Sequence, residues 1–423
     1  MKVLVIGGGG REHAIVWSLR RSPQVTEVVC APGNGGIAEI ARCVPVDVND
    51  LAAMANLAAT EKPGLTVIGP EVPLALGIVD ELERLGLRVF GPTKAAARLE
   101  SSKAFAKSFM QRNGIPTAAY AVCSTLDQVR RELARFTTPV VVKADGLAAG
   151  KGVVICDTHA EAEQAAAEMF SGALLGKTEA EVVLEEFLTG EELSFFALCD
   201  GTHAVEIASA QDHKRVGEGD TGPNTGGMGA YSTDGIATPA MRQWLLRNVA
   251  QKVVDGMKAE GTPFKGILFC GLMMTSRGPM VLEFNTRWGD PETEAILLRM
   301  ETDLCDLFNA SIDGTAGQLA VKMRPGASAC VIAASGGYPG KYASGRVIHG
   351  LTPNQSREDM VVFHAGTAAK DGQLVTAGGR VLAVSAMAPD LRSALDKAYA
   401  ELGKISFEGM QFRRDIGHRA LRG

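Results

Sequence analysis

The strongest constraint on this chain comes from residues 280–294, which read Met-Val-Leu-Glu-Phe-Asn-Thr-Arg-Trp-Gly-Asp-Pro-Glu-Thr-Glu. The apolar start of this stretch predicts a strand, in which successive side chains point to opposite faces. Glu283 and Asn285 then share one face. Leu282 and Phe284 share the other face, which we expect to be buried. A carboxylate and an amide carbonyl at this spacing are hard oxygen ligands, suited to a Mg²⁺ ion that also holds phosphate oxygens.

A polar turn follows this strand. It contains a cation, two carboxylates and two residues that favour turns, which are Arg287, Asp290, Glu292, Gly289 and Pro291. Charged loop residues of this kind can converge on a reacting group. The Glu-x-Asn pattern alone more often marks a strand that ends in a salt-bridged loop. The rest of the chain therefore has to decide between a functional site and a plain loop.

Length and composition narrow the class of protein. A chain of 423 residues is long for one hydrophobic core and predicts about two to four domains. Its formal net charge of −5 offers no attraction to nucleic acid or to an anionic membrane. No apolar run approaches the roughly 20 residues that span a bilayer, and the N-terminus begins a strand rather than a signal peptide. The eight cysteines form no C-x-x-C pair, so we expect no zinc site, no disulfides and a cytoplasmic location.

The N-terminus predicts an anion-binding turn. Residues 2–6 read as a buried strand, the four glycines after them as a turn, and a helix begins near Arg11. Such a turn points backbone N–H groups at an anion. It departs from the dinucleotide fingerprint, because Glu12 replaces the third glycine and the second strand ends in Ala31-Pro32 rather than in an acid. We expect either a phosphate that is not part of NAD or a turn without a ligand.

Two further loops belong to the same predicted edge. The Pro-Gly-Asn-Gly-Gly loop around Asn34 follows the second strand, and the Gly-Pro-Glu loop that ends at Glu71 follows the third. In a doubly wound parallel sheet, ligands bind beyond the carboxyl ends of the strands. The sequence therefore predicts that the three loops share one ligand site.

Lysines mark a second region. A helix is predicted over 95–113 and carries Lys103 and Lys107, of which we expect Lys107 to be exposed and solvated. Lys143 ends a strand at 140–143, where a fixed ammonium group can hold a phosphate as a point charge.

The glycine-rich segment 144–154 follows Lys143. Its spacing does not fit a Walker A loop, and it reads as two strands joined by a flap that carries Gly150 and Lys151. A plain β-turn is the alternative.

Two later segments also carry polar groups. The apolar strand predicted at 182–188 ends in acids, which suits a nucleoside pocket. Residues 211–229 join a basic cluster to a glycine-rich loop whose composition excludes a helix or a central strand. A polar loop of that length inside a compact protein is uncommon unless it is functional. Helices are predicted over 239–259 and 291–312, and strands with a hairpin turn at Asp371-Gly372 after residue 325.

Two of these stretches, Arg-Trp-Gly-Asp-Pro-Glu at 287–292 and Gly-Pro-Asn-Thr-Gly-Gly-Met-Gly at 222–229, resemble the glycinamide ribonucleotide synthetase family of ATP-grasp ligases. Trp288 stands where that family has Leu or Phe, and Thr286 stands where Cys is common. The resemblance extends along the chain in order, as far as Arg-Asp-Ile-Gly at 414–417.

The resemblance implies an α/β fold in three parts. A Rossmann-like domain is expected at 1–100, a two-lobed ATP-grasp domain at 101–324 and a small β-rich domain at 325–423. The lobe at about 120–190 is expected to be mobile. We expect the last domain to cover the N-terminal sheet without chemistry of its own.

The resemblance also implies a reaction. ATP would phosphorylate the carboxylate of glycine to glycyl phosphate, and the amine of 5-phosphoribosylamine would then displace phosphate. The product, glycinamide ribonucleotide, belongs to the second step of de novo purine synthesis. ATP is the implied substrate and Mg²⁺ or Mn²⁺ the implied metal. We expect a monomer that has no nucleic-acid or membrane partner.

Residue roles implied by the resemblance fall into four groups. The metal ligands would be Glu283 and Asn285. ATP would contact Lys103, Lys143, Gly150, Lys151, Glu185, Leu188 and Glu192. The other substrates would contact Gly9, Gly10, Arg11, Glu12, Asn34, Glu71, Lys214, Arg215, Asn224 and Gly289. Catalysis would fall to Arg287, which would stabilise the tetrahedral acyl intermediate, and to Asp212 and Asp290, either of which could orient an amine.

Two other interpretations stay open. One is a different ATP-grasp ligase, such as a carboxylase of purine synthesis, against which the two signature stretches argue. The other is a nucleotide-binding regulatory protein without catalysis, which would be expected to have lost a metal ligand or a lysine.

Overall fold

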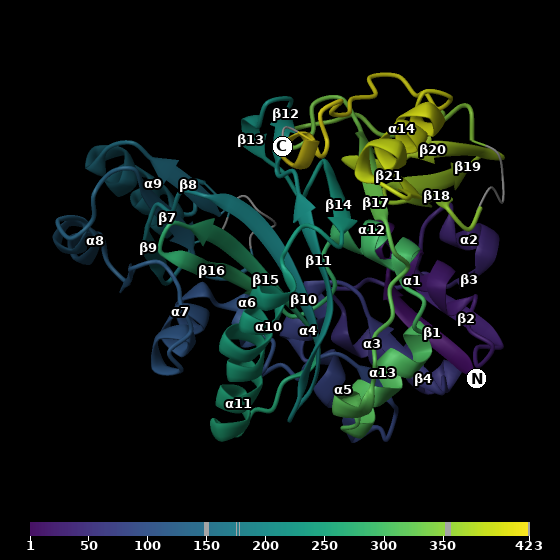
Figure 1. The fold of residues 1–423 in the computed structure, drawn as a ribbon, viewed down its shortest axis with the longest axis horizontal. Coiled ribbons are helices and arrows are strands. Elements are labelled where there is room, and N and C mark those ends of the chain that lie inside the picture. The colour runs from purple at the N-terminus through teal and green to yellow at the C-terminus, as the bar shows by residue number, and fades with distance from the viewer. Residues whose placement is uncertain (148–151, 175, 177, 352–356, 422–423) are drawn as a thin grey trace.

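The computed structural model describes residues 1–147, 152–174, 176, 178–351 and 357–421. It has the α/β architecture that the sequence predicts. Figure 1 shows a parallel N-terminal sheet, a small four-stranded sheet at the opposite end of the molecule, and a long antiparallel sheet between them.

The N-terminal sheet is parallel and doubly wound, with the strand order β3-β2-β1-β4-β5. Val3, Leu4, Val5 and Ile6 of the central strand are all buried, because helices cover both faces of the sheet. Its strands are β1 (Lys2–Gly7), β2 (Glu27–Pro32), β3 (Arg42–Cys43), β4 (Leu65–Ile68) and β5 (Val89–Phe90). Its helices are α1 (Gly10–Leu19), α2 (Ile37–Ile40), α3 (Leu51–Glu61), α4 (Glu71–Leu76) and α5 (Ile78–Arg84). The strand order reverses at β1, so the loops after β1 and β4 border the crevice where such sheets bind ligands.

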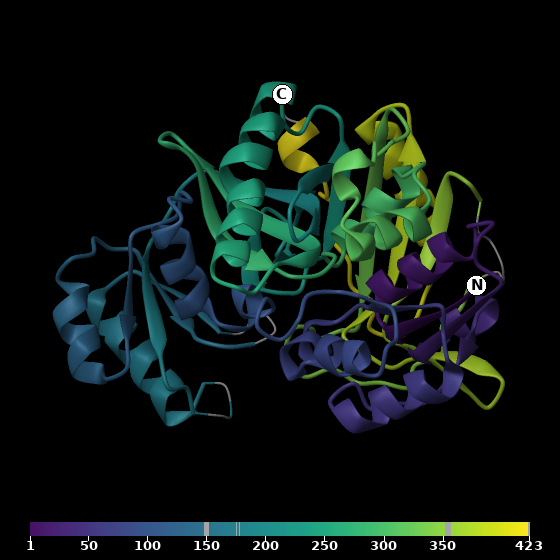
Figure 2. The same ribbon diagram turned by 90° about the horizontal axis from the view of Figure 1, so that it is seen from below.

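The small sheet forms a lobe with a core of its own. Its antiparallel order is β6-β9-β7-β8, and buried residues of its two helices pack on it, among them Val129 and Met169. Figure 2 shows this lobe set apart from the N-terminal sheet in a second view. Its elements are β6 (Tyr120–Cys123), α8 (Leu126–Leu133), β7 (Val140–Ala144), β8 (Val153–Cys156), α9 (His159–Ser171) and β9 (Val182–Glu186).

The long sheet has the order β16-β15-β10-β11-β14-β17-β21-β18. Because β17 pairs with β14, the strands after residue 325 continue the sheet of the preceding region instead of forming a separate one. Its strands are β10 (Glu191–Asp200), β11 (Ala204–Asp212), β14 (Gly229–Thr233), β15 (Lys265–Thr275), β16 (Gly278–Asn285), β17 (Ala327–Ala334), β18 (Met360–His364) and β21 (Arg380–Ala388).

Two short hairpins and several helices complete the fold. Asp371 and Gly372 join one hairpin with φ of 50° and 75°, the left-handed values that the predicted turn requires. The predicted helix 239–259 is continuous but contains one π-helical turn at Leu246–Ala250. The hairpins are β12 (Arg215–Gly217) with β13 (Thr221–Asn224) and β19 (Thr367–Lys370) with β20 (Gln373–Thr376). The helices are α10 (Pro239–Leu245), α11 (Gln251–Ala259), α14 (Leu391–Leu402), α15 (His418–Leu421) and a 3₁₀ turn at Ala316–Gln318.

Two predicted helices are each broken into two. The segment 95–113 contains α6 (Arg98–Ser101) and α7 (Lys103–Arg112), because Ser102 is extended and its hydroxyl accepts the N–H of Phe105 as an N-cap. The segment 291–312 contains α12 (Glu292–Arg299) and α13 (Leu304–Asp313), the second capped by the carboxylate of Asp303. Periodic apolar residues ran through both breaks, so only the capping residues could have revealed them.

Candidate functional site

A cavity of about 700 Å³ lies where the three sheets meet. The loops after β4, helix α7, strands β7, β9 and β16, and a loop of the C-terminal region all contribute to its wall. Most of the predicted site residues line it, namely Arg11, Glu71, Lys103, Lys143, Glu185, Leu188, Glu192, Asp212, Lys214, Asn224, Glu283, Asn285, Arg287, Gly289 and Asp290. Residues that are far apart in sequence therefore converge on one space, and the hydrogen bond from Arg11 to the Trp288 carbonyl joins residues 277 positions apart.

The other predicted residues lie elsewhere. Gly9, Gly10, Glu12 and Asn34 belong to the glycine turn and its neighbouring loop, and do not line the cavity. Arg215 is in the small hairpin, where its guanidinium donates to the Gly222 carbonyl at 2.6 Å. Gly150 and Lys151 lie outside the described residues. Direct contacts of these seven residues with a ligand stay predictions.

Strand β16 brings its polar residues to the cavity with one irregularity. Gly271 pairs with Glu283 and Leu272 with Val281, so Leu282 is the extra residue of a β-bulge. The prediction that Phe284 is buried is confirmed, but the prediction for Leu282 is wrong. Leu282 is half-buried, lines the cavity, and accepts a hydrogen bond from Lys143 Nζ at 3.4 Å through its carbonyl. Bulges of this kind re-aim side chains next to a site, and alternation alone cannot predict them.

Glu283 and Asn285 fit a Mg²⁺ or Mn²⁺ ion that phosphate oxygens help to hold. Burial raises the pKa of Glu283, but the ammonium groups of Lys214, Lys143 and Lys103 outweigh it and hold the pKa below its ordinary value. The carboxylate is therefore ionised at neutral pH. Among the described residues no group of three His, Cys, Asp or Glu side chains could hold a metal alone. One carboxylate and one amide suit Mg²⁺, which usually keeps water and substrate phosphates as further ligands.

Lysines gather at one end of the cavity, which we call the phosphate end and define as Lys103, Lys107, Lys143 and Glu185. Lys103 is the first residue of α7 and donates to the Gly146 carbonyl at 2.8 Å. Lys143 Nζ lies 2.9 Å from Glu185 Oε1. Asp145, just after β7, accepts from the backbone N–H of Ala104 at 3.0 Å and so fixes the start of α7 to the base of the glycine-rich segment.

The prediction that Lys107 is exposed is wrong. Its side chain is 2% exposed, and its Nζ lies 2.8 Å from Glu185 Oε2. Burial lowers its pKa to about 8, although the Glu185 carboxylate opposes the shift. The sequence did hold a signal, because Lys107 is four residues after Lys103 and so shares its helix face.

The opposite end of the cavity is acidic, and we define the acidic end as Glu71, Glu100, Asp212, Asp290 and Glu292 with the cation Arg287. Arg287 Nη2 lies 2.8 Å from Glu100 Oε1, and its Nε lies 3.5 Å from Glu71 Oε2. Burial raises the pKa of Glu100, whereas Arg287 and Arg11 outweigh burial and lower the pKa of Glu71. The N-terminal region thus holds the guanidinium of the signature turn in place.

Asp212 and Glu292 form the most strongly perturbed part of the acidic end. Burial, and then the neighbouring Glu292, raise the pKa of Asp212 well above its ordinary value. Burial also raises the pKa of Glu292, whose carboxylate accepts a hydrogen bond from Ser194 at 2.9 Å. Lys214 stands between the two ends, with its Nζ 3.0 Å from Glu192 and 3.8 Å from Glu283.

The glycine turn after β1 is closed by protein groups. Glu12 accepts the backbone N–H of Gly9 at 2.7 Å and pairs with Arg11 Nε at 2.5 Å. A Cβ at Gly69 would collide with the Glu12 carboxylate, so that carboxylate occupies a space walled by glycines. Because Glu12 takes an N–H that would otherwise face an anion, the turn differs from a dinucleotide-binding one, as the sequence predicted.

Asn34 connects the same turn to the C-terminal region. Its amide group donates to the carbonyls of Gly8 at 2.9 Å and His364 at 2.7 Å. Its carbonyl oxygen accepts from the backbone of Gly36 and Ile37. Both amide hydrogens are committed to the protein, so a direct contact with a substrate would have to replace one of these bonds.

Arg380 and Tyr338 are two of the cavity residues from the C-terminal region that sequence reasoning missed. Arg380 Nη1 donates to the carbonyls of Gly226 at 2.6 Å and Asp290 at 2.9 Å, and lies 3.1 Å from the Asp290 carboxylate. The hydroxyl of Tyr338 accepts the N–H of Gly226 at 3.0 Å. No local motif marks either residue, because only the pairing of β17 with β14 brings this region to the cavity.

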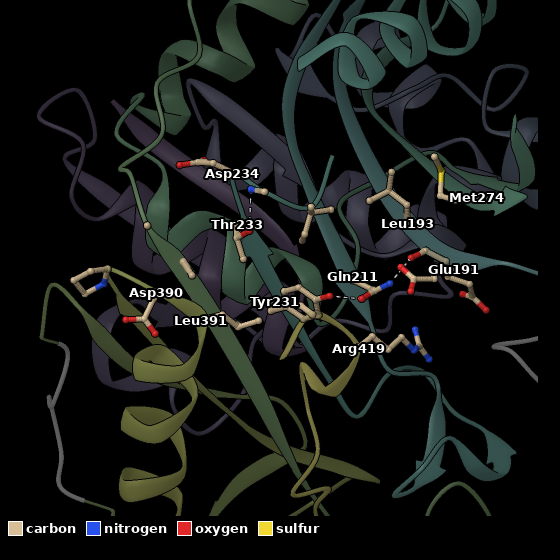
Figure 3. A pocket seen from close by; sticks show the side chains of 17 residues that line it. Glu191, Leu193, Gln211, Tyr231, Thr233, Asp234, Met274, Asp390, Leu391 and Arg419 are labelled. Atoms are coloured by element: carbon tan, nitrogen blue, oxygen red, sulfur yellow. Dashed lines mark hydrogen bonds between the residues drawn. The ribbon is translucent and has the colours of Figure 1, made fainter. Parts of the chain in front are cut away.

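A second cavity, of about 630 Å³, lies beside the first and shares Glu192 with it (Figure 3). The hydroxyl of Tyr231 donates to Gln211, whose amide group donates to the Glu192 carbonyl at 2.7 Å. Figure 3 shows Asp390 and Leu391 of the C-terminal region on its other wall, and Arg419 beside Gln211 and Glu191. Nothing in the sequence predicted this cavity.

Comparison with known proteins gives the family. Models described as Phosphoribosylglycinamide synthetase match in three parts, the N domain at 1–100, the ATP-grasp (A) domain at 101–293 and the C domain at 328–419. The chain is 50% identical to a phosphoribosylamine–glycine ligase of Xanthomonas campestris, over 100% of this chain and 98% of that one. It is 49% identical to the one of Ralstonia nicotianae, over 100% of both chains.

Solved structures agree with this assignment. The phosphoribosylamine–glycine ligase of Thermotoga maritima superposes with a TM-score of 0.86 at 37% identity, covering 98% of this chain and 100% of that one. The biotin carboxylase domain of the 2-oxoglutarate carboxylase of Hydrogenobacter thermophilus, solved with MgADP, shares the fold with a TM-score of 0.74 at 18% identity, over 97% and 91% of the two chains. Among the described residues, no helix combines the length and hydropathy needed to cross a membrane. The chain belongs to the phosphoribosylglycinamide synthetase family of ATP-grasp enzymes.

Proposed function

We propose that this protein joins glycine to 5-phosphoribosylamine at the expense of ATP, as the names of its relatives indicate. The observation that best supports the proposal is the division of one cavity into a lysine-rich end and an acidic end, with Glu283 and Asn285 between them. A triphosphate requires cations, whereas two amines require carboxylates. The reaction is a step of purine biosynthesis.

The phosphate end would bind ATP. Lys103 and Lys143 would contact its phosphates, Glu185 and Leu188 would contact the nucleoside through their backbone, and Glu192 would bind the ribose. Glu283 and Asn285 would hold Mg²⁺ or Mn²⁺, which when bound supplies positive charge to the transferring phosphoryl group. A carboxylate oxygen of glycine would attack the γ-phosphorus, and the bond to the β-phosphate oxygen would break, which gives ADP and glycyl phosphate.

The acidic end would carry out the second step. The amine nitrogen of phosphoribosylamine would attack the acyl carbon, the bond to the phosphate oxygen would break, and phosphate and a proton would leave. Arg287 would stabilise the oxyanion of the tetrahedral intermediate. Asp212 and Asp290 would orient the amines, and the raised pKa of Asp212 would make its carboxylate a better proton acceptor when ionised.

Other features of the protein belong to this proposal. We assign the domains to 1–100, 101–324 and 325–423, with a mobile lobe at about 120–190. The protein would act in the cytoplasm as a monomer, on small molecules alone.

The test is ADP release in the presence of Mg²⁺, ATP and glycine, with and without freshly prepared phosphoribosylamine. We expect ADP to form only when both glycine and phosphoribosylamine are present, together with an equal amount of glycinamide ribonucleotide. If ADP formation does not depend on phosphoribosylamine but is stimulated by another carboxylic acid, the proposed substrates are wrong. ATP binding without any turnover would favour a regulatory protein.

A further inference from the structure

The phosphate end contains a buried cluster of three charges. The carboxylate of Glu185 lies between two lysines, with its Oε2 2.8 Å from Lys107 Nζ and its Oε1 2.9 Å from Lys143 Nζ. Lys107 and Glu185 are each 2% exposed, and the side chain of Lys143 is 10% exposed. The two lysines come from different elements, α7 and β7, and the carboxylate from β9.

The charges of this cluster do not cancel. Two ammonium groups and one carboxylate leave one net positive charge in a site where water screens little. Burial raises the pKa of Glu185, but Lys143 and Lys107 outweigh it and hold the pKa below its ordinary value, so the carboxylate is ionised. Without Lys107, Glu185 would pair with Lys143 alone. That pair would be neutral and would draw Lys143 towards β9.

Lys107 is also tied to the strand that carries the proposed metal ligands. Its Nζ donates to the hydroxyl of Thr117 at 2.8 Å, and that hydroxyl donates to the Val281 carbonyl of β16 at 2.6 Å. Lys143 reaches the same strand through the Leu282 carbonyl at 3.4 Å. The two lysines therefore hold Glu185 from opposite sides, and both are fixed against neighbouring residues of β16.

We propose that Lys107 is a positioning residue for ATP, which neutralises Glu185 and so leaves the charge of Lys143 available to the phosphates. This inference rests on the proposed function, because it assumes that Lys143 contacts ATP. It differs from a purely structural ion pair in one respect. Loss of Lys107 weakens nucleotide binding because the Glu185 carboxylate is left without its second partner. Removal of that carboxylate as well must therefore restore nucleotide binding.

Three variants and a control test this. Lys107→Met and Glu185→Gln each remove one buried charge while keeping most of the side-chain volume, and the third variant combines them. Arg112→Met removes a cation from the exposed part of the same helix, where it pairs with Glu260. The readout is the affinity of each protein for ADP with Mg²⁺, by calorimetry, with the KM for ATP and kcat measured alongside. Circular dichroism checks the fold of each variant.

We expect Lys107→Met to bind ADP about tenfold more weakly, a loss typical of one misdirected charge contact. Its KM for ATP should rise by about the same factor while kcat changes by less than about threefold, because the charge acts in binding. The double variant should return to within about threefold of the original protein, and Arg112→Met should stay there.

Two results would overturn the inference. One is a Lys107→Met protein that binds ADP as well as the original. The other is a double variant that binds as weakly as Lys107→Met, which would show direct contact of Lys107 with the nucleotide or a merely structural pair. If Lys107→Met fails to fold, the double variant still decides, since it removes the uncompensated Glu185 carboxylate together with Lys107 and leaves only Lys143, whose side chain lines the cavity. ADP binding needs neither glycine nor phosphoribosylamine, so a wrong acceptor substrate would not affect the result.

Discussion

The two ends of the cavity are built on opposite principles. At the phosphate end, Lys107 and Lys143 hold the Glu185 carboxylate between them, and Lys143 and Lys103 also act on the Glu283 carboxylate of β16. At the acidic end, the five carboxylates outnumber the guanidinium groups that act on them, which among the described residues are those of Arg287, Arg11 and Arg380. Burial lowers the pKa of Lys103 and Lys107 and raises the pKa of the acids Glu100, Asp212 and Glu292. Each end therefore holds charges that the fold alone does not satisfy.

The difference teaches where the substrates should bind. A buried excess of one charge is costly, and a ligand of the opposite charge relieves the cost. We expect a polyanion to complete the phosphate end and amines to complete the acidic end, so that binding energy at each end would come partly from relief of repulsion in the empty protein. Changes at one end should then leave binding at the other almost unaffected.

The largest effect is expected for Arg287→Ala. This change removes the guanidinium that pairs with both Glu100 and Glu71, so kcat should fall by about 10³-fold, as when a main stabiliser of an acyl oxyanion is lost. Affinity for ADP with Mg²⁺ should change by less than about threefold, because the phosphate end is intact. Steady-state ligation and calorimetry give the two numbers. Arg88→Ala, which breaks an exposed pair with Asp313, is the control.

Normal turnover of Arg287→Ala would exclude the proposed role of Arg287. A matching loss of ADP affinity would instead show that the two ends are coupled.

The next effect concerns Glu283, which stands between the two ends. Glu283→Gln keeps the shape but removes the charge that would hold the metal, so the Mg²⁺ concentration for half-maximal activity should rise about tenfold or more. Raising Mg²⁺ should restore part of the activity. Titration of activity with Mg²⁺ measures the shift, and Glu260→Gln, an exposed acid, is the control. An unchanged Mg²⁺ requirement would remove Glu283 from the metal site.

Asp212→Asn should have a smaller effect, confined to the acidic end. The amide cannot accept a proton from an amine, so kcat/KM for phosphoribosylamine should fall about 10²-fold, the usual contribution of a general base. The KM for ATP should stay within about threefold of the original value. A fall in the affinity for ATP instead would contradict the separation of the two ends.

The sequence predicted some residues of the cavity and missed others, because local patterns reveal some contacts and not others. Lys103, Lys143, Glu283 and Asn285 belong to strands, helices or loops that the neighbouring residues in sequence are enough to predict. Three strand-and-loop patterns of this kind predicted a doubly wound parallel sheet at the N-terminus. These local signals, together with the two signature stretches, were enough for the fold, the family and most of the cavity wall.

The residues that sequence missed depend on contacts between distant segments. Lys107 is buried because β9 crosses α7, and a periodic helix does not show what covers its polar face. Arg380 reaches the cavity only through a sheet that joins β14 to β17. The β-bulge at Leu282 and the helix break at Ser102 interrupt the regular spacing of apolar residues. A prediction that assumes this spacing cannot locate them.

The smallest expected effect is on stability, at Glu294. This residue lies behind the acidic end, is fully buried, and neither carboxylate oxygen has a hydrogen-bond partner among the described residues. Burial, and then the neighbouring Asp290, raise its pKa well above the ordinary value, although Arg380 opposes the shift. Between the pKa of the unfolded chain and the raised pKa, the folded protein keeps a proton that the unfolded chain loses. The free energy of unfolding must therefore fall as pH rises through this range.

Glu294→Gln tests whether the side chain at this position is neutral in the folded protein, because glutamine has almost the same shape as glutamate and is uncharged at every pH. The melting temperature of the variant should exceed that of the original protein by a few degrees at pH 8, whereas near pH 4, where both forms are neutral, the difference should vanish. Thermal unfolding at the two pH values measures this, with Glu260→Gln as the exposed control. A variant less stable than the original at pH 8 would mean that the carboxylate is ionised and paired in the fold. The protein would then satisfy the charge of Glu294 before any substrate arrives, in contrast to the charges that line the acidic end itself.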